Sequence, residues 1–303
     1  MQYFPLFVDT RDRSVLVVGG GDVAARKLEL LCRTDALITV IATEACAEIQ
    51  ALSHSGRIKL HERPVNDDDI CDWDLLYLAT NDEALNVHLT GVARRRNIWA
   101  NVVDNPAYCD FITPSIVDRG RLVVAISTAG AAPVFARDIR ARLEAWLPPS
   151  LTPLFDFIAS RRQQVQETLA TVPARRRFWE RFFALNGDRF DAQTELHFED
   201  AFLSLEGQGE LLLIDEDTSP RLLPIAAMAM LQRLDIIESD ISLPPELNEL
   251  LRRDAERRPA SSFAALDKAL ETGKRVLVYA DAAQIKALRA HFPQARHLRP
   301  GAL

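Results

Sequence analysis

Short apolar runs alternate with amphipathic stretches over residues 1–113. The runs predict buried strands, and the stretches, whose apolar residues recur every three or four positions, predict helices. The expected strands are 15–18, 37–41, 58–60, 75–79 and 98–103, and the expected helices are 23–32, 44–52 and 84–94. Strands and helices that alternate in this way form a parallel sheet covered by helices, so these residues are expected to form an α/β domain.

The pattern changes after residue 104. Two extended runs, 111–117 and 122–126, flank a turn at 118–120, and a helix is expected from Pro133 to the prolines at 148 and 149. The next stretch, 151–190, has a helical pattern, and the pattern after residue 205 is again α/β. The elements expected there are strands at 211–214, near 236 and at 276–279, and helices at 222–234, 245–257 and 263–271. We therefore expect four parts: an α/β domain (1–113), a mixed α+β central segment (114–147), a helical domain (148–204) and a small α/β domain (205–303).

Aromatic side chains gather in the expected helical domain. They are Phe155, Phe157, Phe178, Trp179, Phe182 and Phe183. A helical segment this rich in aromatic residues buries one face against a large surface, and we favour the interface of a homodimer. The alternative is packing within one chain.

Composition narrows the function classes. The net charge of −7 over 303 residues argues against a nucleic-acid binder. No apolar run approaches the roughly 20 residues that span a membrane, and no N-terminal signal pattern is present. The four cysteines form no C-x-x-C pair, which disfavours a zinc site or a disulfide framework and suits a reducing cytoplasm.

Three glycines follow the first apolar run and precede the first helix. Gly19 allows a sharp turn, Gly21 allows backbone amides to approach a diphosphate, and Ala24 allows the helix to pack close to the strand. The anion would lie at the helix N-terminus, beside Gly20, Asp22 and Val23. This context predicts a dinucleotide site in a Rossmann-type domain. The alternative is a tight glycine turn in an α/β domain without a nucleotide.

Polar residues at the other strand ends extend the expected site. Thr43 and Glu44 follow the second strand, where an acidic group usually binds the ribose hydroxyls. No arginine lies beside them in the sequence, which favours NAD over NADP. Ala79 and Thr80 follow the strand at 75–79, and their small size would let a cofactor lie close to the sheet.

A carboxylate follows the strand at 98–103. Asp104 would point into the crevice beside the nicotinamide, where a carboxylate can accept the proton that leaves with a hydride. The alternative is a turn or capping aspartate. Ser127 and Thr128 precede the helix at Pro133 and could form an anion pocket, or could simply cap that helix.

Taken together these stretches resemble the sirohaem synthase family, in its precorrin-2 dehydrogenase/sirohydrochlorin ferrochelatase module. The resemblance runs in family order over residues 1 to about 200. The matching stretches are YFPLF (3–7), RDR (11–13), VVGGGDVAARK (17–27), LATND (78–82), NVVD (101–104), FITPSIVDR (111–119), AISTAGAAP (125–133) and RRRFWERFF (175–183).

The resemblance implies both an activity and a set of residues. NAD, bound by the glycine turn with Asn101 nearby, would oxidise precorrin-2 to sirohydrochlorin, and Fe²⁺ would then be inserted as a substrate metal. Asp104 would serve as the general base in both steps and hold the iron transiently. The loop with Ser127, Thr128 and Gly130 would bind the tetrapyrrole, with Arg119 and Arg137 as clamps for its carboxylates. The middle and helical segments would build a homodimer.

Residues 209–292 resemble the opening of the uroporphyrinogen-III methyltransferase domain of trifunctional members. The glycine-rich loop expected after its first strand is replaced by the acidic run 215–220. Acidic residues there would repel a carboxylate and lack the backbone freedom of glycine. We expect a degenerate, truncated remnant that does not bind S-adenosylmethionine. Two other readings remain, a non-catalytic NAD-sensing domain and a dehydrogenase that relies on a separate chelatase.

Overall fold

The computed structural model describes residues 2–203 and 209–300. The chain forms two compact units, residues 1–160 and 161–303, and each is described by itself. The expected boundary near residue 205 lies outside the described residues, so the four-part division stays a prediction.

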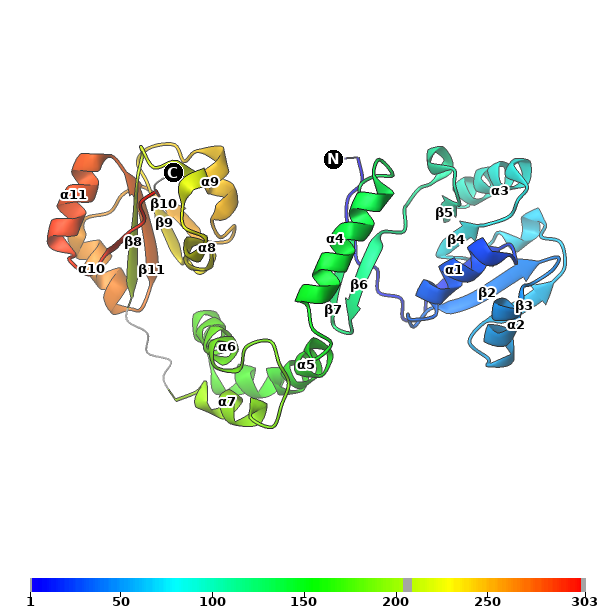
Figure 1. Cartoon of the computed structure of the whole chain (residues 1–303), viewed down its shortest axis with the longest axis horizontal. Helices are drawn as coiled ribbons and strands as arrows, with labels where there is room; N and C mark the ends of the chain where they lie inside the picture. The colour runs from blue at the N-terminus through cyan, green and yellow to red at the C-terminus, as the bar shows by residue number, and fades with distance from the viewer. Residues whose placement is uncertain (1, 204–208, 301–303) are drawn as a thin grey trace. The chain divides into compact units, whose positions relative to one another are not determined.

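A five-stranded parallel sheet forms the centre of the first unit, in the order β3-β2-β1-β4-β5 (Figure 1). Every strand and helix expected for residues 1–113 is present, with ends shifted by up to three residues. The strands are β1 (Ser14–Val18), β2 (Leu37–Ala42), β3 (Lys59–Glu62), β4 (Leu75–Leu78) and β5 (Trp99–Val102), and the helices are α1 (Asp22–Leu31), α2 (Ala47–His54) and α3 (Glu83–Arg95), with short 3₁₀ turns η1 (Asp67–Asp69) and η2 (Pro106–Tyr108).

Helices cover both faces of this sheet because its central strands are apolar on both sides. Val15 and Val17 pack with Leu28 of α1 and Ile49 of α2. Leu16 and Val18, which alternate with them, pack on the opposite face with residues of α3 such as Leu89. Alternation along β1 therefore places one apolar layer on each face and leaves the strand ends as the accessible edge.

A hairpin and a helix complete the first unit. Strands β6 (Ser115–Arg119) and β7 (Leu122–Ile126) pair antiparallel, and helix α4 (Pro133–Trp146) packs against them. The sequence placed Arg119 in the turn, but it ends β6, and Gly120 takes the left-handed conformation (φ +69°).

Helices α5 (Leu151–Thr168), α6 (Val172–Asn186) and α7 (Thr194–Asp200) follow, and α5 crosses from the first unit into the second. The rings of Phe178 and Phe182 on α6 are fully buried and contact Phe198 of α7 edge to face. These two rings pack within the chain. Phe183, by contrast, keeps 39% of its surface exposed.

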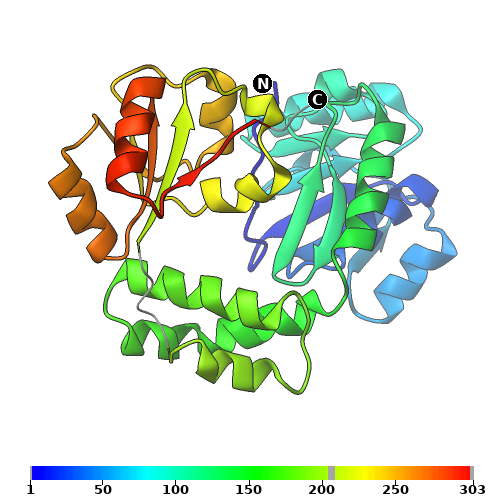
Figure 2. The same ribbon diagram turned by 60° about the vertical axis from the view of Figure 1, so that its left-hand side comes forward.

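The second unit contains another five-stranded parallel sheet, in the order β10-β9-β11-β8-β12. Its helices lie on both sides of the sheet (Figure 2). The strands are β8 (Glu210–Asp215), β9 (Ile236–Glu238), β10 (Glu256–Arg258), β11 (Arg275–Ala280) and β12 (Arg296–His297), and the helices are α8 (Ile225–Leu231), α9 (Pro245–Leu250), α10 (Phe263–Glu271) and α11 (Ala282–His291), with the 3₁₀ turn η3 (Pro220–Leu222).

Two helices expected for this unit are shorter than the sequence predicts, and some elements were not expected. The helix expected at 245–257 ends at Leu250, and its last residues instead belong to strand β10. The helix expected at 222–234 is shorter, covering Ile225–Leu231. Helix α11 and strand β12 were not expected.

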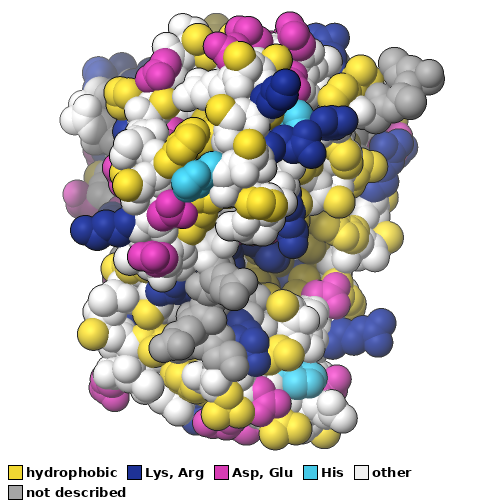
Figure 3. Space-filling view, turned by 90° about the vertical axis from the view of Figure 1, so that its left-hand side faces the viewer, with side chains coloured by type: hydrophobic (Ala, Val, Ile, Leu, Met, Phe, Trp, Pro, Cys, Tyr) yellow, Lys and Arg dark blue, Asp and Glu magenta, His cyan; other side chains and the backbone are white. Residues whose placement is uncertain are grey.

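The surface of one face mixes side chains of every kind. Figure 3 shows basic, acidic and hydrophobic side chains interspersed there. No helix in the described ranges is both long and apolar enough to cross a membrane.

Candidate functional site

The glycine turn after β1 fits tightly against two neighbouring loops. Gly19 has φ +123°, and a β-carbon there would lie 2.3 Å from the carbonyl oxygen of Ala79. A β-carbon at Gly20 would lie 1.9 Å from the carbonyl oxygen of Glu44. The Gly20 carbonyl in turn accepts a hydrogen bond from the Cys46 amide at 2.8 Å. The turn and the loop after β2 therefore hold each other in place.

Gly21 has different surroundings. A β-carbon there would meet no atom within 4 Å, so the residue borders open space. It is also the N-cap of α1, and no side chain caps that helix end. Free amides and the positive end of the helix dipole therefore face the opening, as an anion site requires. Ala24, one turn into the helix, is fully buried, as the motif predicts.

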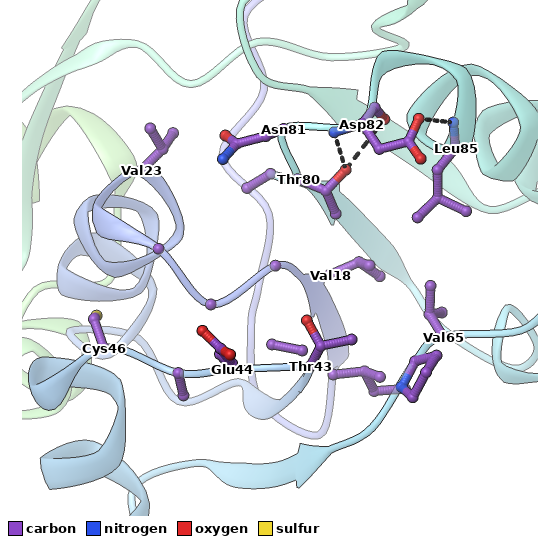
Figure 4. A pocket seen from close by; sticks show the side chains of 18 of the residues that line it. Val18, Val23, Thr43, Glu44, Cys46, Val65, Thr80, Asn81, Asp82 and Leu85 are labelled. Carbon is purple, nitrogen blue, oxygen red and sulfur yellow. Dashed lines mark hydrogen bonds between the residues drawn. The ribbon is translucent and has the colours of Figure 1, made fainter.

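A cavity of 810 Å³ opens at this edge of the sheet (Figure 4). It brings together all of the expected cofactor residues except Asn101. They are Gly19, Gly20, Gly21, Asp22, Val23, Thr43, Glu44, Ala79 and Thr80. Three loops that follow β1, β2 and β4 contribute them, because parallel strands present their carboxyl ends at one edge.

The cavity has a further wall that the sequence did not predict. Arg63, Pro64 and Val65, which follow β3, line it as well. The sequence argument that no arginine lies near Glu44 is therefore wrong in three dimensions, because strand pairing brings Arg63 to the same cavity. β3 is a short edge strand with a weak apolar pattern, so nothing in the sequence marked the loop after it.

Hydrogen bonds fix the loop after β4. The Thr80 hydroxyl donates to Oδ1 of Asn86 at 2.7 Å, and the Asn86 amide donates to the Thr80 carbonyl at 3.0 Å. Asn86 is buried on α3, and the Asp82 carboxylate caps that helix by accepting from the Leu85 amide. The small residues Ala79 and Thr80 thus form a rigid floor of the cavity.

Asp104 lies in a turn after β5. Its side chain is exposed, and its backbone is left-handed (φ +58°), which aspartate tolerates better than most residues. The Cys109 thiol contacts the backbone on both sides of this turn. Its sulfur accepts from the Val102 amide at 3.2 Å and lies 3.5 Å from the carbonyl of Asn105, so it bridges the residues on either side of Asp104. Asp104 itself does not line the cavity.

A cation on α1 interacts with Asp104. Lys27 on α1 is half-buried and interacts electrostatically with the carboxylate of Asp104 and with Cys109. Burial lowers the pKa of the Lys27 ammonium, and burial also raises the pKa of the Cys109 thiol. Within the described ranges, the Lys27 amine makes no hydrogen bond or ion pair, so a proton donor or acceptor is left beside Asp104.

Asn101 serves the fold in this structure. It is buried on β5, and its amide donates to the Phe111 carbonyl at 2.9 Å. Its Oδ1 is buried with no hydrogen-bond partner. The expectation that Asn101 lines the cofactor cavity is therefore not met.

Ser127, Thr128 and Gly130 lie in the loop between β7 and α4. The Ser127 hydroxyl accepts from the Ala129 amide at 3.0 Å, and the Thr128 hydroxyl accepts from the Ala132 amide at 3.2 Å. Both oxygens thus shape the loop, and their protons stay available to a ligand. Ala129 and Gly130, which follow these hydroxyls, have left-handed backbone.

The two expected arginine clamps differ. Arg119 is largely buried, and its guanidinium donates to the Leu147 carbonyl at 2.8 Å and to the carboxylate of Glu144. It therefore ties the end of α4 to the hairpin and is not free to clamp a substrate. Arg137 on α4 is exposed, and its guanidinium lies 3.5 Å from the carboxylate of Asp138.

Within the described ranges, no group of three or more His, Cys, Asp or Glu side chains could hold a metal ion. A metal that reached Asp104 would therefore find one carboxylate and no resident binding site.

Three family models match the chain in succession. They are a putative NAD(P)-binding domain over residues 6–115, the central domain of sirohaem biosynthesis proteins over 119–145, and the sirohaem synthase dimerisation region over 150–200. The first covers the cavity and Asp104, and the second covers the loop with Ser127 and Thr128.

Full-length relatives agree. The siroheme synthase of Pseudoalteromonas atlantica is 40% identical over 268 residues, and siroheme synthase 1 of Yersinia enterocolitica is 43% identical over 267. These matches cover 85% of this chain and 58% and 56% of the two relatives, so the chain spans little more than half their length. The solved structure of SirC, a precorrin-2 dehydrogenase, superposes with a TM-score of 0.50 at 25% identity, covering 67% of this chain and 98% of that one. With three matching family models in succession and these relatives, the chain belongs to the sirohaem synthase family.

Proposed function

We propose that this protein oxidises precorrin-2 to sirohydrochlorin with NAD. The observation that carries the proposal is the position of Asp104, an exposed carboxylate at the end of β5, on the sheet whose β1, β2 and β4 ends form the dinucleotide cavity. Membership of the sirohaem synthase family and the likeness to a precorrin-2 dehydrogenase support it.

The chain's own residues fit a dinucleotide. The uncapped start of α1 and the open space at Gly21 would receive the diphosphate, and Glu44 would accept hydrogen bonds from ribose hydroxyls. Bound NAD supplies the hydride acceptor. Asp104 accepts the proton that must leave the substrate when the hydride departs, because precorrin-2 loses two hydrogens in becoming sirohydrochlorin. Lys27, whose charge interacts with Asp104, lies beside this carboxylate in the proposed site.

We propose that the same carboxylate serves iron insertion. Metallation requires the loss of two pyrrole protons, which Asp104 would accept one after the other, passing the first to solvent before it takes the second, and its ionised oxygen would be a transient ligand for the entering Fe²⁺. Iron is a substrate here. The hydroxyl protons of Ser127 and Thr128 and the exposed Arg137 are the groups that would bind the carboxylates of the tetrapyrrole. The family's dimerisation region supports a homodimer.

An anaerobic absorbance assay tests both steps. Precorrin-2 and NAD are supplied first and Fe²⁺ afterwards, to the wild-type chain and to Asp104→Asn, which keeps the shape of the side chain and suits the left-handed backbone. We expect the wild type to form NADH and then the spectrum of sirohaem, and the variant to lose both.

Each other outcome has a distinct meaning. NADH without sirohaem in the wild type would restrict the chain to the dehydrogenase step, with a separate chelatase. Loss of only one step in the variant would assign the other to another base. No NADH from a folded chain that binds NAD would contradict the enzyme and favour a sensor of NAD.

A further inference from the structure

Arg63 stands at the adenosine end of the cavity. In the pairing of β2 with β3, Ala42 lies opposite Glu62, so the next residues, Thr43 and Arg63, continue side by side beyond the strands. Both line the cavity, together with Glu44. In a dinucleotide site the end of the second strand is where the adenosine ribose is bound. Among the described residues that line the cavity, Arg63 is the basic side chain, and it stands at the end where a ribose 2′-phosphate would lie.

The guanidinium of Arg63 is already engaged. Its Nη1 donates to Oδ2 of Asp69 at 2.8 Å and its Nη2 donates to Oδ1 of Asp69 at 2.6 Å, which makes the pair bidentate. Nη1 also donates to the carbonyl of Pro64 at 3.0 Å. Both terminal nitrogens, which would bind a phosphate, therefore already donate hydrogen bonds.

Asp69 is itself built into the fold. Its Oδ2 accepts from the Asn66 amide at 2.8 Å, while Oδ1 of Asn66 accepts from the amides of Asp68 and Asp69. Only 14% of the Asp69 side chain is exposed, against 43% for Arg63. The carboxylate is therefore fixed in its turn, and it fixes the more exposed guanidinium. The hydrogen bond from Arg63 also holds the pKa of Asp69 below its ordinary value, so the carboxylate stays ionised at neutral pH.

We propose that Asp69 is a specificity-determining residue that makes this site select NAD over NADP by holding Arg63 in a bidentate ion pair. A 2′-phosphate needs an uncompensated guanidinium to offset its charge, and here Asp69 already neutralises that charge and occupies the fork formed by the two terminal nitrogens. Glu44 adds repulsion at the same place. This inference rests on the proposal that the cavity binds a dinucleotide.

The test is the binding of NADH and NADPH to the full chain, followed by the fluorescence of the reduced nicotinamide. Asp69→Asn removes the charge and keeps an oxygen that can accept from the Asn66 amide. We expect the ratio of the NADPH to the NADH dissociation constant to fall about tenfold or more in this variant, because a freed arginine gains a charge-assisted bond. NADH affinity should stay within about twofold to threefold.

Two control variants test whether the release of Arg63 causes the change in the ratio of dissociation constants. Asp68→Asn removes the same charge from the same turn without touching Arg63, and it should leave the ratio unchanged. The double variant Asp69→Asn/Arg63→Gln should return the ratio to the wild-type value, because the phosphate then has no guanidinium to bind.

Three results would contradict the inference or its premise. An unchanged ratio in folded Asp69→Asn would overturn the role of Asp69. Glu44→Gln changes an exposed loop residue and leaves the Arg63–Asp69 pair intact. Tight NADPH binding by this variant would assign the selection to Glu44 alone. That result would overturn the role of Asp69 even if Asp69→Asn failed to fold. Failure of the wild type to bind either dinucleotide would refute the proposed cofactor site instead.

Discussion

At the scale of single residues, Gly20 and Gly21 are neighbours with opposite surroundings. A methyl group at Gly20 would collide with the backbone after β2, whereas one at Gly21 would project into open space. Gly20→Ala should lower the free energy of unfolding by about 2 to 3 kcal/mol, because the backbone must shift to admit it. Gly21→Ala should leave the stability near the wild-type value.

Both glycine variants should bind NADH poorly, but for different reasons. Gly20→Ala displaces the loops that form the site, and Gly21→Ala occupies the space meant for the diphosphate. Thermal unfolding and NADH titration of the two variants side by side check this. Normal NADH binding by Gly21→Ala would show that the diphosphate lies elsewhere.

Lys27 gives a prediction for alkaline pH. Burial lowers the pKa of its ammonium in the folded chain relative to the unfolded chain. The unfolded chain therefore binds more protons between the two pKa values, and the stability contributed by Lys27 rises as pH increases through that window towards about 10. The free energy of unfolding of the wild type relative to Lys27→Met should increase from pH 7 to pH 10, as measured by urea unfolding. If the difference in unfolding free energy did not change with pH, the charge of Asp104 would fully offset the effect of burial on the Lys27 ammonium.

The same residues show how far a sequence can predict a site. The glycines, Thr43, Glu44 and Thr80 were predicted because a motif and strand ends mark them, and the structure brings them to one cavity. Arg63 was missed because only the pairing of β3 with β2 brings it there. Asn101 and Arg119 were misjudged because their polar groups are used by the fold, which only the hydrogen bonds reveal. The catalytic role of Asp104 stays a prediction.

At the scale of elements, Asp74 joins the starts of two central strands. Its Oδ2 accepts from the amide of Ser14 at 2.8 Å, and Oδ1 accepts from Arg13 at 2.6 Å. Loss of these bonds in Asp74→Ala should lower the free energy of unfolding by about 1 to 2 kcal/mol at pH 7.

The pH dependence of this loss follows from the pKa of Asp74. The hydrogen bond from the Ser14 amide lowers that pKa in the folded chain. The contribution is thus present above the unfolded pKa of about 4 and is lost as pH falls through the lower folded value. The difference between wild type and Asp74→Ala should stay constant from pH 8 to pH 5 and shrink in stronger acid, as measured by chemical unfolding at each pH. A difference that persisted after acidification would assign the effect to packing.

Elements were predictable where burial made them apolar throughout. The central strands β1, β2 and β4 are continuous apolar runs, and their existence is confirmed. β10 and β12 lie at the two edges of their sheet and carry Glu256, Arg257, Arg258, Arg296 and His297. Pairing with a neighbour makes them strands, so their own residues gave no strand signal.

At the scale of the whole molecule, two crossed ion pairs join α6 to the C-terminal sheet. Arg176 of α6 pairs with Asp235, and Glu180 of the same helix pairs with Arg275 at the start of β11. Asp235 also accepts from the Arg275 amide at 3.0 Å and is almost fully buried. The helical segment and the sheet of the second unit are therefore expected to unfold together.

Asp235→Ala should uncouple them. It removes the nearer carboxylate from the partly buried guanidinium of Arg176, which keeps a 3.8 Å contact with Glu180. This should cost about 3 kcal/mol, and thermal unfolding of the second unit should move to lower temperature. NADH affinity should not change, because the cavity lies in the first unit. Asp254→Ala, which removes the exposed carboxylate that pairs with Arg252, is the control and should have a much smaller effect. Equal losses in the two variants would refute the coupling.

The ion pair between Asp69 and Arg63 also bears on how the cofactor preference of such a protein could change during evolution. Aspartate and asparagine codons differ by a single base, so the step that frees the guanidinium is among the shortest available to the gene. The arginine that would read a 2′-phosphate is already in place and already positioned. A lineage that drew on the phosphorylated dinucleotide pool could therefore arise by releasing an existing group, with no new cation to recruit.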